Sequence, residues 1–447
     1  MMTKKWQPYH TYKDSGVEWL GAIPEHWEVK RLKYVCCINP SKSPISNLSL
    51  DTEISFVPME YVDNYGNIDL RETKTLREVS QGYTYFQNKD VIIAKITPCF
   101  ENGKGALCSN LHNTIGFGST EFHVIRVISN KTIPEFTYYL TKSTRFTNLG
   151  SSELYGVAGQ KRVPESFLSN YVTGIPPLPE QQKIAQFLDQ ETSKIDKLIT
   201  KKERLIELLK EKRTALISHA VTKGLNPDVP MKDSGVEWLG EIPEHWEVKR
   251  LKFLITESLK YGANESAQLE DKDCPRFIRI TDITEDGLLK EDTFRSLPKD
   301  IAKPFILKTG DILFARSGAT FGKSFMYREQ WGIACHAGYL IRARLKLAEA
   351  LPEFVSYFAN SSVYWDWISS IFIQATIQNV SAEKYANLWM GVPDIQEQQK
   401  IAQFLDRETG KIDNLITKTR TSIDHLKEYR TALISAAVTG KIDVREH

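Results

Sequence analysis

Two long stretches of the chain carry apolar residues at helical spacing. The first follows Glu180, after which neither proline nor glycine occurs before Gly224. A comparable stripe extends from Ile401 to Leu433. At about 1.5 Å per residue, roughly 40 residues make a helix about 60 Å long, so the pattern predicts two long helical arms. The first stripe recurs at steps of three, four and seven, as on one face of an amphipathic helix, and comprises Ile184, Leu188, Ile195, Leu198, Leu205, Leu209 and Leu216.

An amphipathic helix of this length needs a partner for its apolar face. Two similar helices in one chain suit each other, and we expect the arms to pair as an antiparallel coiled coil. Breaks in the stripe at Glu191, Lys202 and Lys212 keep it from being a regular heptad. The alternative is that each arm packs on the domain that precedes it.

The segments before the arms carry short apolar runs typical of strands. Each segment then has a short aromatic helix that opens with Pro-Glu-Phe, at Pro134 and at Pro352. The elements correspond between the two halves, while most residues between them differ, which predicts one α+β scaffold used twice. The predicted strands cover residues 54–62, 90–96 and 121–128 in the first half, and 276–283, 311–317 and 338–345 in the second.

The chain also repeats parts of its sequence at a nearly constant distance. KDSGVEWLGAIPEHWEVKRLK, at 13–33, returns at 232–252 with one exchange in 21 positions. EQQKIAQFLD, at Glu180, returns at Glu397. The offsets are 219 and 217 residues, so the intervening segments differ by two residues. We name 13–33 and 232–252 the lead-in blocks and expect their tryptophans to anchor the core or a seam: Trp19, Trp27, Trp238 and Trp246.

The order of lead-in block, variable segment and arm therefore occurs twice. It predicts an α+β fold with two pseudo-repeated α/β domains, each followed by a long helix. The predicted parts are a domain at 1–175, a central helical arm at 176–224, a second domain at 225–391 and a C-terminal helical arm at 392–447.

Composition and charge leave several functions open. The 447 residues are 41% hydrophobic and 26% charged, with a formal net charge of +2. A strongly basic chain would favour nucleic acid, but a local basic face also occurs on nearly neutral chains. No apolar run approaches the roughly 18 residues of a membrane span, and the start lacks an apolar signal region. We therefore expect a cytoplasmic protein with no membrane partner.

One stretch is similar to a nucleotide-binding loop. SGATFGKS, at 317–324, follows a predicted strand, and its Gly322-Lys323-Ser324 fits the end of G-x-x-x-x-G-K-[ST]. The first glycine of that pattern is replaced by Ser317, and the residues after Ser324 are predicted as strand and turn, which offers a phosphate no helix N-terminus. No other catalytic or metal-binding motif is found, so we expect no catalytic site and no metal site.

Polar and basic residues gather on loops at matching places in both halves. One pair of loops follows the strands DVIIAK and DILFAR, and the other pair, at 155–163 and 374–380, precedes the arms. Such side chains reach phosphates and base edges, although they also suit ordinary solvated loops. The candidate DNA-binding residues are Lys95, Thr97, Lys104, Tyr155, Gln160, Lys161 and Arg162 in the first half, and Arg316, Thr320, Lys323, Gln374, Thr376, Gln378 and Asn379 in the second.

Taken together, these motifs resemble the specificity subunits of type I restriction–modification systems. The resemblance covers nearly the whole chain and rests on SGVEWLGEIPEHWEVKRLK, on IPPLPEQQKIAQFLD at 175–189, and on DILFARSGATFGK and TIQNVS in the second half. The second half departs from the pattern with DIQ at 394–396, and the first half with GVAGQKRV in place of T-I-Q-N-V. The latter departure makes the base-reading residues of the first half harder to place.

The resemblance implies a protein that is not itself an enzyme. It implies two target recognition domains, each reading one half of a split, asymmetric site in double-stranded DNA, with the paired arms as a ruler for the unread gap. The implied partners are two methyltransferase subunits and two ATP-driven restriction subunits. This chain would hold no cofactor, because S-adenosylmethionine, ATP and Mg²⁺ would belong to the partners. Two identical methyltransferases would need two similar docking surfaces, which explains a repeated frame.

Two other functions remain compatible with the sequence. The arms and variable domains would also suit a coiled-coil adaptor that binds proteins, and Lys323 with Ser324 would serve a P-loop enzyme. Tight, Mg²⁺-dependent ATP binding that is lost in Lys323→Ala would favour the enzyme. Failure to select any DNA sequence with the methyltransferases present would favour the adaptor.

Overall fold

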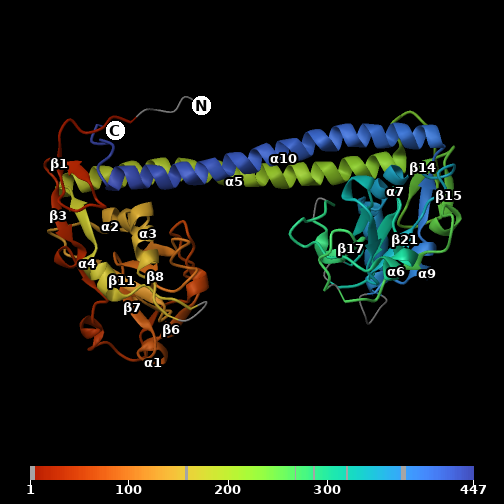
Figure 1. Cartoon of the computed structure of the whole chain (residues 1–447). Helices are drawn as coiled ribbons and strands as arrows, with labels where there is room; N and C mark the ends of the chain where they lie inside the picture. Colours follow the sequence, from red (N-terminus) through yellow and green to blue (C-terminus); the bar gives the residue numbers. More distant parts are fainter. Residues whose placement is uncertain are drawn as a thin grey trace. The chain divides into compact units, whose positions relative to one another are not determined.

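A computed structural model describes residues 6–156, 160–266, 268–284, 287–318, 321–373 and 379–446. The chain divides into two compact units: unit 1 comprises Met1–Lys202 with Thr421–His447, and unit 2 comprises Glu203–Arg420. Both boundaries fall inside long helices, α5 (Leu178–Lys223) and α10 (Ile395–Val438). Each unit therefore contains one variable domain, the start of the helix that follows it and the end of the other helix (Figure 1).

Unit 1 is built on two four-stranded sheets. In the first sheet, β8 is buried throughout and α2 (Pro134–Thr141) packs on it. In the second sheet β10 runs parallel to β5 and antiparallel to β7. The first sheet has the order β4 (Cys36–Ile38), β11 (Phe122–Val127), β8 (Val91–Ala94), β9 (Gly105–Leu107), and the second has the order β6 (Thr73–Thr75), β5 (Glu53–Val57), β10 (Ile115–Gly118), β7 (Thr84–Gln87).

Unit 2 repeats this plan. Its main sheet has the same order of equivalent strands, and β17 (Arg276–Ile278) pairs in parallel with β20 (Ala334–His336) as β5 does with β10. The predicted α+β scaffold used twice is therefore confirmed. The main sheet is β16 (Lys260–Tyr261), β21 (Leu340–Ala343), β18 (Ile312–Ala315), β19 (Ser324–Met326). The helices of this domain include α6 (Lys299–Ala302), α7 (Pro352–Phe358), α8 (Ser362–Ile373) and α9 (Ala382–Ala386).

Most of the predicted elements are present, but two predicted strands are too long. β8, β11, β18 and β21 and both Pro-Glu-Phe helices match the prediction. The strand predicted over 54–62 ends at Val57, because Pro58 follows and Met59–Tyr61 form a 3-10 turn. In unit 2 the strand predicted over 276–283 ends at Ile278, and Ile280–Asp282 form the equivalent turn. Both strands were predicted too long because apolar residues continue at strand spacing into the 3-10 turn, where the backbone changes direction.

The lead-in block joins the start and the end of each domain. β1 (Tyr12–Asp14) and β2 (Ala22–Pro24) form a hairpin, and β3 (Glu28–Arg31) pairs with β12 (Val172–Ile175). The second block repeats this arrangement with β13 (Met231–Asp233), β14 (Glu241–Pro243), and β15 (Glu247–Arg250) paired with β22 (Trp389–Val392).

The tryptophans of the blocks lie as predicted. Trp27 and Trp246 are fully buried, and the half-buried Trp19 and Trp238 pack against Tyr171 and Trp367. Trp27 also requires glycine on the paired strand, because a Cβ at Gly174 would lie 2.9 Å from its ring. The repeated blocks are therefore a structural frame for each domain.

Within each unit, α5 and α10 contact each other in an antiparallel arrangement. In unit 1, Asp196 forms an ion pair with Arg430, and in unit 2 the repeat-equivalent Asp413 forms one with Arg213, both at 2.9 Å. The residue numbers of each pair add up to the same value, so both units use the same register. In unit 2, Leu209 packs against Ile412 and Ile416 of α10.

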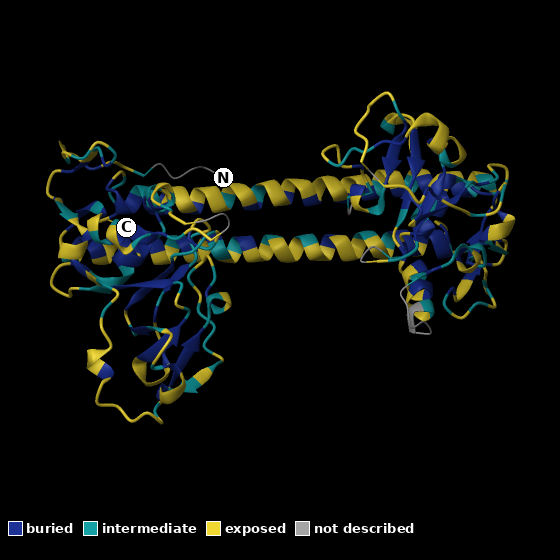
Figure 2. Ribbon diagram, turned by 60° about the horizontal axis from the view of Figure 1, so that its bottom comes forward, coloured by how far each residue is buried: buried dark blue, intermediate teal, exposed yellow. Residues whose placement is uncertain are grey.

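The ends of the arms also belong to the cores of the domains. In unit 2, Ile401 and Leu405 at the start of α10 and Ile217 and Val221 at the end of α5 are buried in one cluster with Trp246. Figure 2 shows buried residues along one side of these helices and exposed residues along the other. In unit 2 the two helices therefore pack on the domain near their ends and on each other around Leu209.

A buried glutamine ties each arm to its domain. Gln398 has no exposed surface. Its Oε1 accepts from the Leu351 amide at 2.8 Å, and its Nε2 donates to the carbonyls of Glu349 and Pro393, both at 2.9 Å. The equivalent Gln181 is also fully buried and bonds Thr132, Ile133, Lys131 and Pro176.

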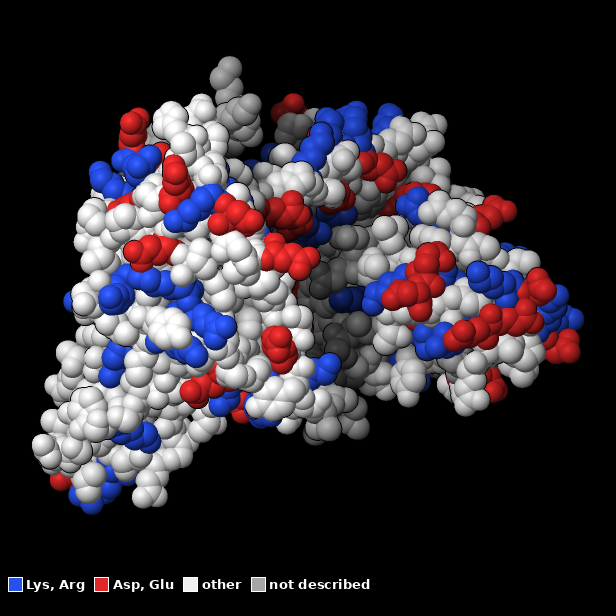
Figure 3. Space-filling model, turned by 60° about the vertical axis from the view of Figure 1, so that its left-hand side comes forward, with Lys and Arg blue, Asp and Glu red and all other residues white. Residues whose placement is uncertain are grey.

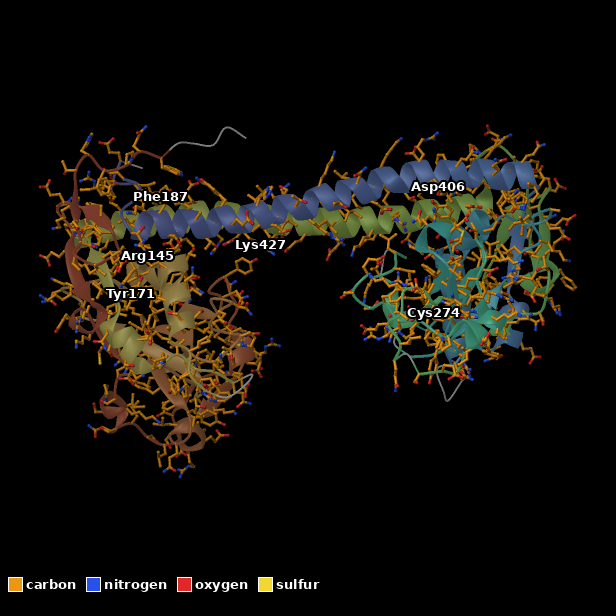
Figure 4. All side chains as sticks on the ribbon, in the orientation of Figure 1. Arg145, Tyr171, Phe187, Cys274, Asp406 and Lys427 are labelled. Atoms are coloured by element: carbon orange, nitrogen blue, oxygen red, sulfur yellow. The ribbon has the colours of Figure 1, made fainter. Side chains whose placement is uncertain are left out.

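The last residue of the repeated EQQKIAQFLD motif makes a second tie. Asp406, labelled in Figure 4, accepts a hydrogen bond from the Tyr357 hydroxyl of α7 at 2.6 Å. In unit 1, Asp189 accepts from Tyr139 of α2 at the same distance. Both tyrosines have a pKa above the usual value because burial disfavours their charged form. We call these contacts of the glutamine and the aspartate with the domain the joint of each arm: Gln181 and Asp189 in unit 1, and Gln398 and Asp406 in unit 2. The motif repeats because the same joint occurs in both units.

Candidate nucleic-acid interface

In unit 1, the two predicted recognition loops are hydrogen-bonded to each other. The Thr97 amide donates to the Lys161 carbonyl at 2.9 Å, and the Val163 amide donates to the Lys95 carbonyl at 2.8 Å. The loop after β8 and the segment before α4 (Glu165–Asn170) therefore form one surface, which brings Lys95, Thr97 and Lys161 together. Lys161 is exposed.

Arg162 is engaged within this surface rather than free. Its guanidinium forks onto Glu121, with Nε–Oε2 and Nη2–Oε1 distances of 2.9 and 2.8 Å. Hydrogen bonding to Arg162 lowers the pKa of Glu121 below its usual value. Gln160 is exposed, as is the ring of Tyr155 at 61%. Tyr155, Gln160 and Lys161 are thus the predicted residues of this segment that face solvent.

Lys104 anchors the loop after β8. Its Nζ donates to the Met59 carbonyl at 2.9 Å. A second lysine, which sequence reasoning missed, supports the same loop: Lys142 donates to the carbonyls of Gly103 and Gly105 at 2.6 and 2.7 Å. Burial lowers the pKa of Lys142 to about 7. No motif marks Lys142, because it lies on the segment after α2 and reaches the loop only in the folded domain.

In unit 2, the corresponding loops also meet. Arg316, directly after β18, donates from Nε to Asn379 Oδ1 at 3.3 Å, and its guanidinium lies over the ring of Tyr261 at 5.0 Å. Ser317 and Asn379 form a backbone bridge. Lys323 is exposed, next to the turn at Gly322. The predicted residues Thr320, Gln374, Thr376 and Gln378 lie outside the described residues.

The two units place these loops at equivalent positions. The Lys95 amide donates to the carbonyl of Glu121 at 2.8 Å, and the Arg316 amide donates to that of Tyr339 at 3.0 Å. Glu121 and Tyr339 were not predicted as site residues, because each stands at the start of a strand that looks structural in the sequence. Tyr339 is 65% exposed. The same place on the scaffold thus carries a carboxylate in unit 1 and an aromatic ring in unit 2.

The stretch SGATFGKS does not form a nucleotide-binding loop. Ser324 begins β19, which pairs with β18, so a strand follows the glycine where a P-loop needs a helix. This agrees with the strand and turn predicted there.

Both signs of charge occur on the surface that Figure 3 displays. Lys and Arg lie among Asp and Glu over much of this surface, and in some places several Lys and Arg lie together. Among the described residues, no group of three or more His, Cys, Asp or Glu side chains is placed to hold a metal ion. In the same part of the chain, no helix is both long and apolar enough to cross a membrane.

Comparison with known proteins gives consistent matches. The family model described as type I restriction modification DNA specificity domain matches residues 24–208 and 243–425. The EcoAI specificity subunit of Escherichia coli is 41% identical over 177 residues, 39% of this chain. That match spans 30% of the EcoAI subunit, and a similar one to EcoEI spans 27% of its length. The MjaVIII specificity subunit of Methanocaldococcus jannaschii is 23% identical over 95% of this chain and 94% of its own.

Solved structures share the fold. A chain from a type I R-M system has a TM-score of 0.74 at 18% identity, covering 94% of this chain and 99% of that chain. The HsdS subunit from Thermoanaerobacter tengcongensis has a TM-score of 0.53 at 17% identity, covering 94% and 98%. The family model matches both repeated halves, from the lead-in block into the following arm. The chain therefore belongs to the family of type I restriction–modification DNA specificity subunits.

Proposed function

We propose that this chain is the non-catalytic DNA-recognition subunit of a type I restriction–modification complex. Its two variable domains each read one half of a bipartite, asymmetric site in double-stranded DNA. The paired parts of α5 and α10 set the gap between the half-sites. The repeated frame docks two methyltransferase subunits, which bring S-adenosylmethionine. Two restriction subunits, which bring ATP and Mg²⁺, complete the assembly.

One observation carries this proposal: the family model matches twice, and the two matched halves share their frame but not their loops. The shared residues are structural, such as Gln181 and Gln398. The residues that differ lie on paired loops, where Arg162 in one unit corresponds to Asn379 in the other. A pseudo-repeated frame suits two copies of one partner, while divergent loops suit two different half-sites.

The proposal is tested by mapping methylated adenines in the host genome with and without this chain. We expect a two-part motif with a fixed gap that disappears when the chain is removed. A continuous motif, or methylation that persists without the chain, would contradict it. A second experiment distinguishes DNA recognition from the alternative of a coiled-coil adaptor. The chain and its methyltransferases are incubated with random duplexes, from which an adaptor would select no sequence.

Exchange of one domain should change one half-site. Replacing residues 34–174 with the corresponding domain of a relative should give a new sequence in one half of the motif and leave the other half and the gap unchanged. The junctions are suited to this because β3 and β12 pair at the base of the domain, and the donor must keep glycine at position 174, beside Trp27. Methylation mapping measures the result. Loss of both half-sites in an assembled, soluble complex would contradict independent domains.

Two loop substitutions should separate affinity from specificity. Lys323 is an exposed cation, so Lys323→Ala should weaken binding to all sequences alike and reduce the slope of log K against log salt by about one. Gln378→Ala, by contrast, should relax one base of the second half-site, since an amide pair fits adenine. Binding to specific and random duplexes at several salt concentrations measures both effects. Intact affinity and preference in Gln378→Ala would remove that residue from the interface.

A further inference from the structure

A groove of about 680 Å³ opens on unit 2 and is used by none of the predicted residues. Its floor is apolar, with Phe277 only 2% exposed at the centre of β17 and Ala337 beside it. Its rim carries exposed polar side chains: Asn264, Ser266, Thr281 and Tyr339.

The groove is continuous with the loop that carries Arg316. The Tyr339 carbonyl on the rim accepts from the Arg316 amide at 3.0 Å. The ring of Tyr261, over which the Arg316 guanidinium lies, comes three residues before Asn264 on the same segment. A ligand that contacts Arg316 would therefore extend directly over the rim of the groove.

The charges of the groove favour base edges over phosphates. Among its described lining residues, Arg279 is the only cation, and its guanidinium is committed to the buried Asp282, with Nε–Oδ2 and Nη2–Oδ1 distances of 3.0 and 2.7 Å. Glu265 adds a negative charge to the rim. A phosphate would meet net repulsion here, whereas neutral amide and hydroxyl groups over an apolar floor suit the donors, acceptors and methyl groups of bases.

The Asn264 side chain lies against Gly338. A Cβ at Gly338 would lie 1.9 Å from Asn264 Oδ1, so a side chain at that position would displace the amide. The two segments are held together here, because the Gly338 amide donates to the Ala263 carbonyl at 2.7 Å. The absence of a side chain at 338 thus leaves room for the Asn264 amide at this place on the rim.

We propose that this groove is a base-binding subsite of the second recognition domain and that Asn264 determines specificity within it. The ligand is the base-edge surface of double-stranded DNA, and the carboxamide of Asn264, both donor and acceptor, fits an adenine edge. The subsite rests on the proposed DNA-recognition function and adds a contact outside the two loops. In unit 1 the segment equivalent to 279–281 is Pro58-Met59-Glu60, so the two domains differ at this place.

The test uses the complex of this chain with its methyltransferase subunits and a duplex library randomised through both half-sites. Asn264→Ala and Gly338→Ala should each reduce discrimination at one position of the second half-site by roughly 10- to 100-fold. The first half-site and the salt slope should not change, because no phosphate contact is removed. Leu347→Ala is the control, since Leu347 is 64% exposed in the same unit and does not line the groove.

The possible outcomes separate this inference from the proposed function. Wild-type complex that selects no sequence contradicts both. Wild-type selection of a bipartite site, together with unchanged selection by Asn264→Ala and Gly338→Ala, contradicts the subsite alone. A loss that appears as a lower salt slope at every sequence would make the groove a phosphate contact and would likewise overturn the assignment. Relaxation at one base in both variants, with Leu347→Ala unchanged, supports it.

Discussion

Gln398→Ala is expected to lower the stability of unit 2 by about 3–5 kcal/mol. The side chain is fully buried and makes three hydrogen bonds, one from the Leu351 amide and two to the carbonyls of Glu349 and Pro393. Alanine would leave one donor and two acceptors without partners at a buried site, at about 1–3 kcal/mol each. Calorimetric unfolding, in which the two units can give separate transitions, measures the effect.

The next residue provides a matched control. Gln399 has the same side chain, stands on the same turn of α10 and is exposed, so Gln399→Ala should change stability by less than about 0.5 kcal/mol. Gln181→Ala and the exposed Gln182→Ala form the same comparison in unit 1. Equal stability of Gln398→Ala and Gln399→Ala would show that this joint does not hold the arm to the domain.

These joints explain why the repeated motifs are so similar. Among the described residues, the hydrogen-bond partners of the Gln398 side chain are main-chain groups, and those of Gln181 are main-chain groups together with the Thr132 hydroxyl. Such contacts tolerate changes in the neighbouring side chains but no change in the glutamine itself. The loops at Arg162 and Asn379 are under no such restriction. The frame can therefore stay constant while the loops differ.

The arms and the main strands could be predicted from the sequence because their patterns are long or strongly apolar. The stripe from Ile184 to Leu216 predicted α5, and DVIIAK and DILFAR predicted β8 and β18. The strand over 54–62 was extended too far because Met59 and Tyr61 continue the apolar pattern through a 3-10 turn. The spacing of apolar residues alone does not indicate where the backbone changes direction.

The correspondence of the candidate loops between the two halves was predictable, and the contacts of their side chains were less so. The common offset indicated which loops correspond between the halves, and the structure adds that the two loops of one unit meet, through backbone bridges at Arg162 in unit 1 and at Asn379 in unit 2. The partners of individual side chains were not predictable, because Glu121 is distant in sequence from Arg162, and Met59 from Lys104. Whether a basic side chain is free for DNA depends on such distant neighbours.

Inserting four residues after Lys202 in α5 is expected to shift or abolish the spacer while leaving both half-sites unchanged. The insertion moves the rest of α5 by about 6 Å along its axis, one helical turn. It falls between Asp196 and Arg213, whose partners Arg430 and Asp413 share one register, so the two ion pairs can no longer form together. Methylation mapping of the assembled complex measures the gap.

A second insertion provides the decisive control. In the shared register Lys202 stands opposite Asp424, so adding four residues after Asp424 in α10 should restore both ion pairs and lengthen the paired arms by one turn. With DNA rising about 3.4 Å per base pair, the double insertion should give an active complex whose gap is longer by about two base pairs. The single insertion lacks this compensation, so its assembled complex should methylate the bipartite site less than the double insertion does. An active double insertion with an unchanged gap would show that the arms do not set the spacing.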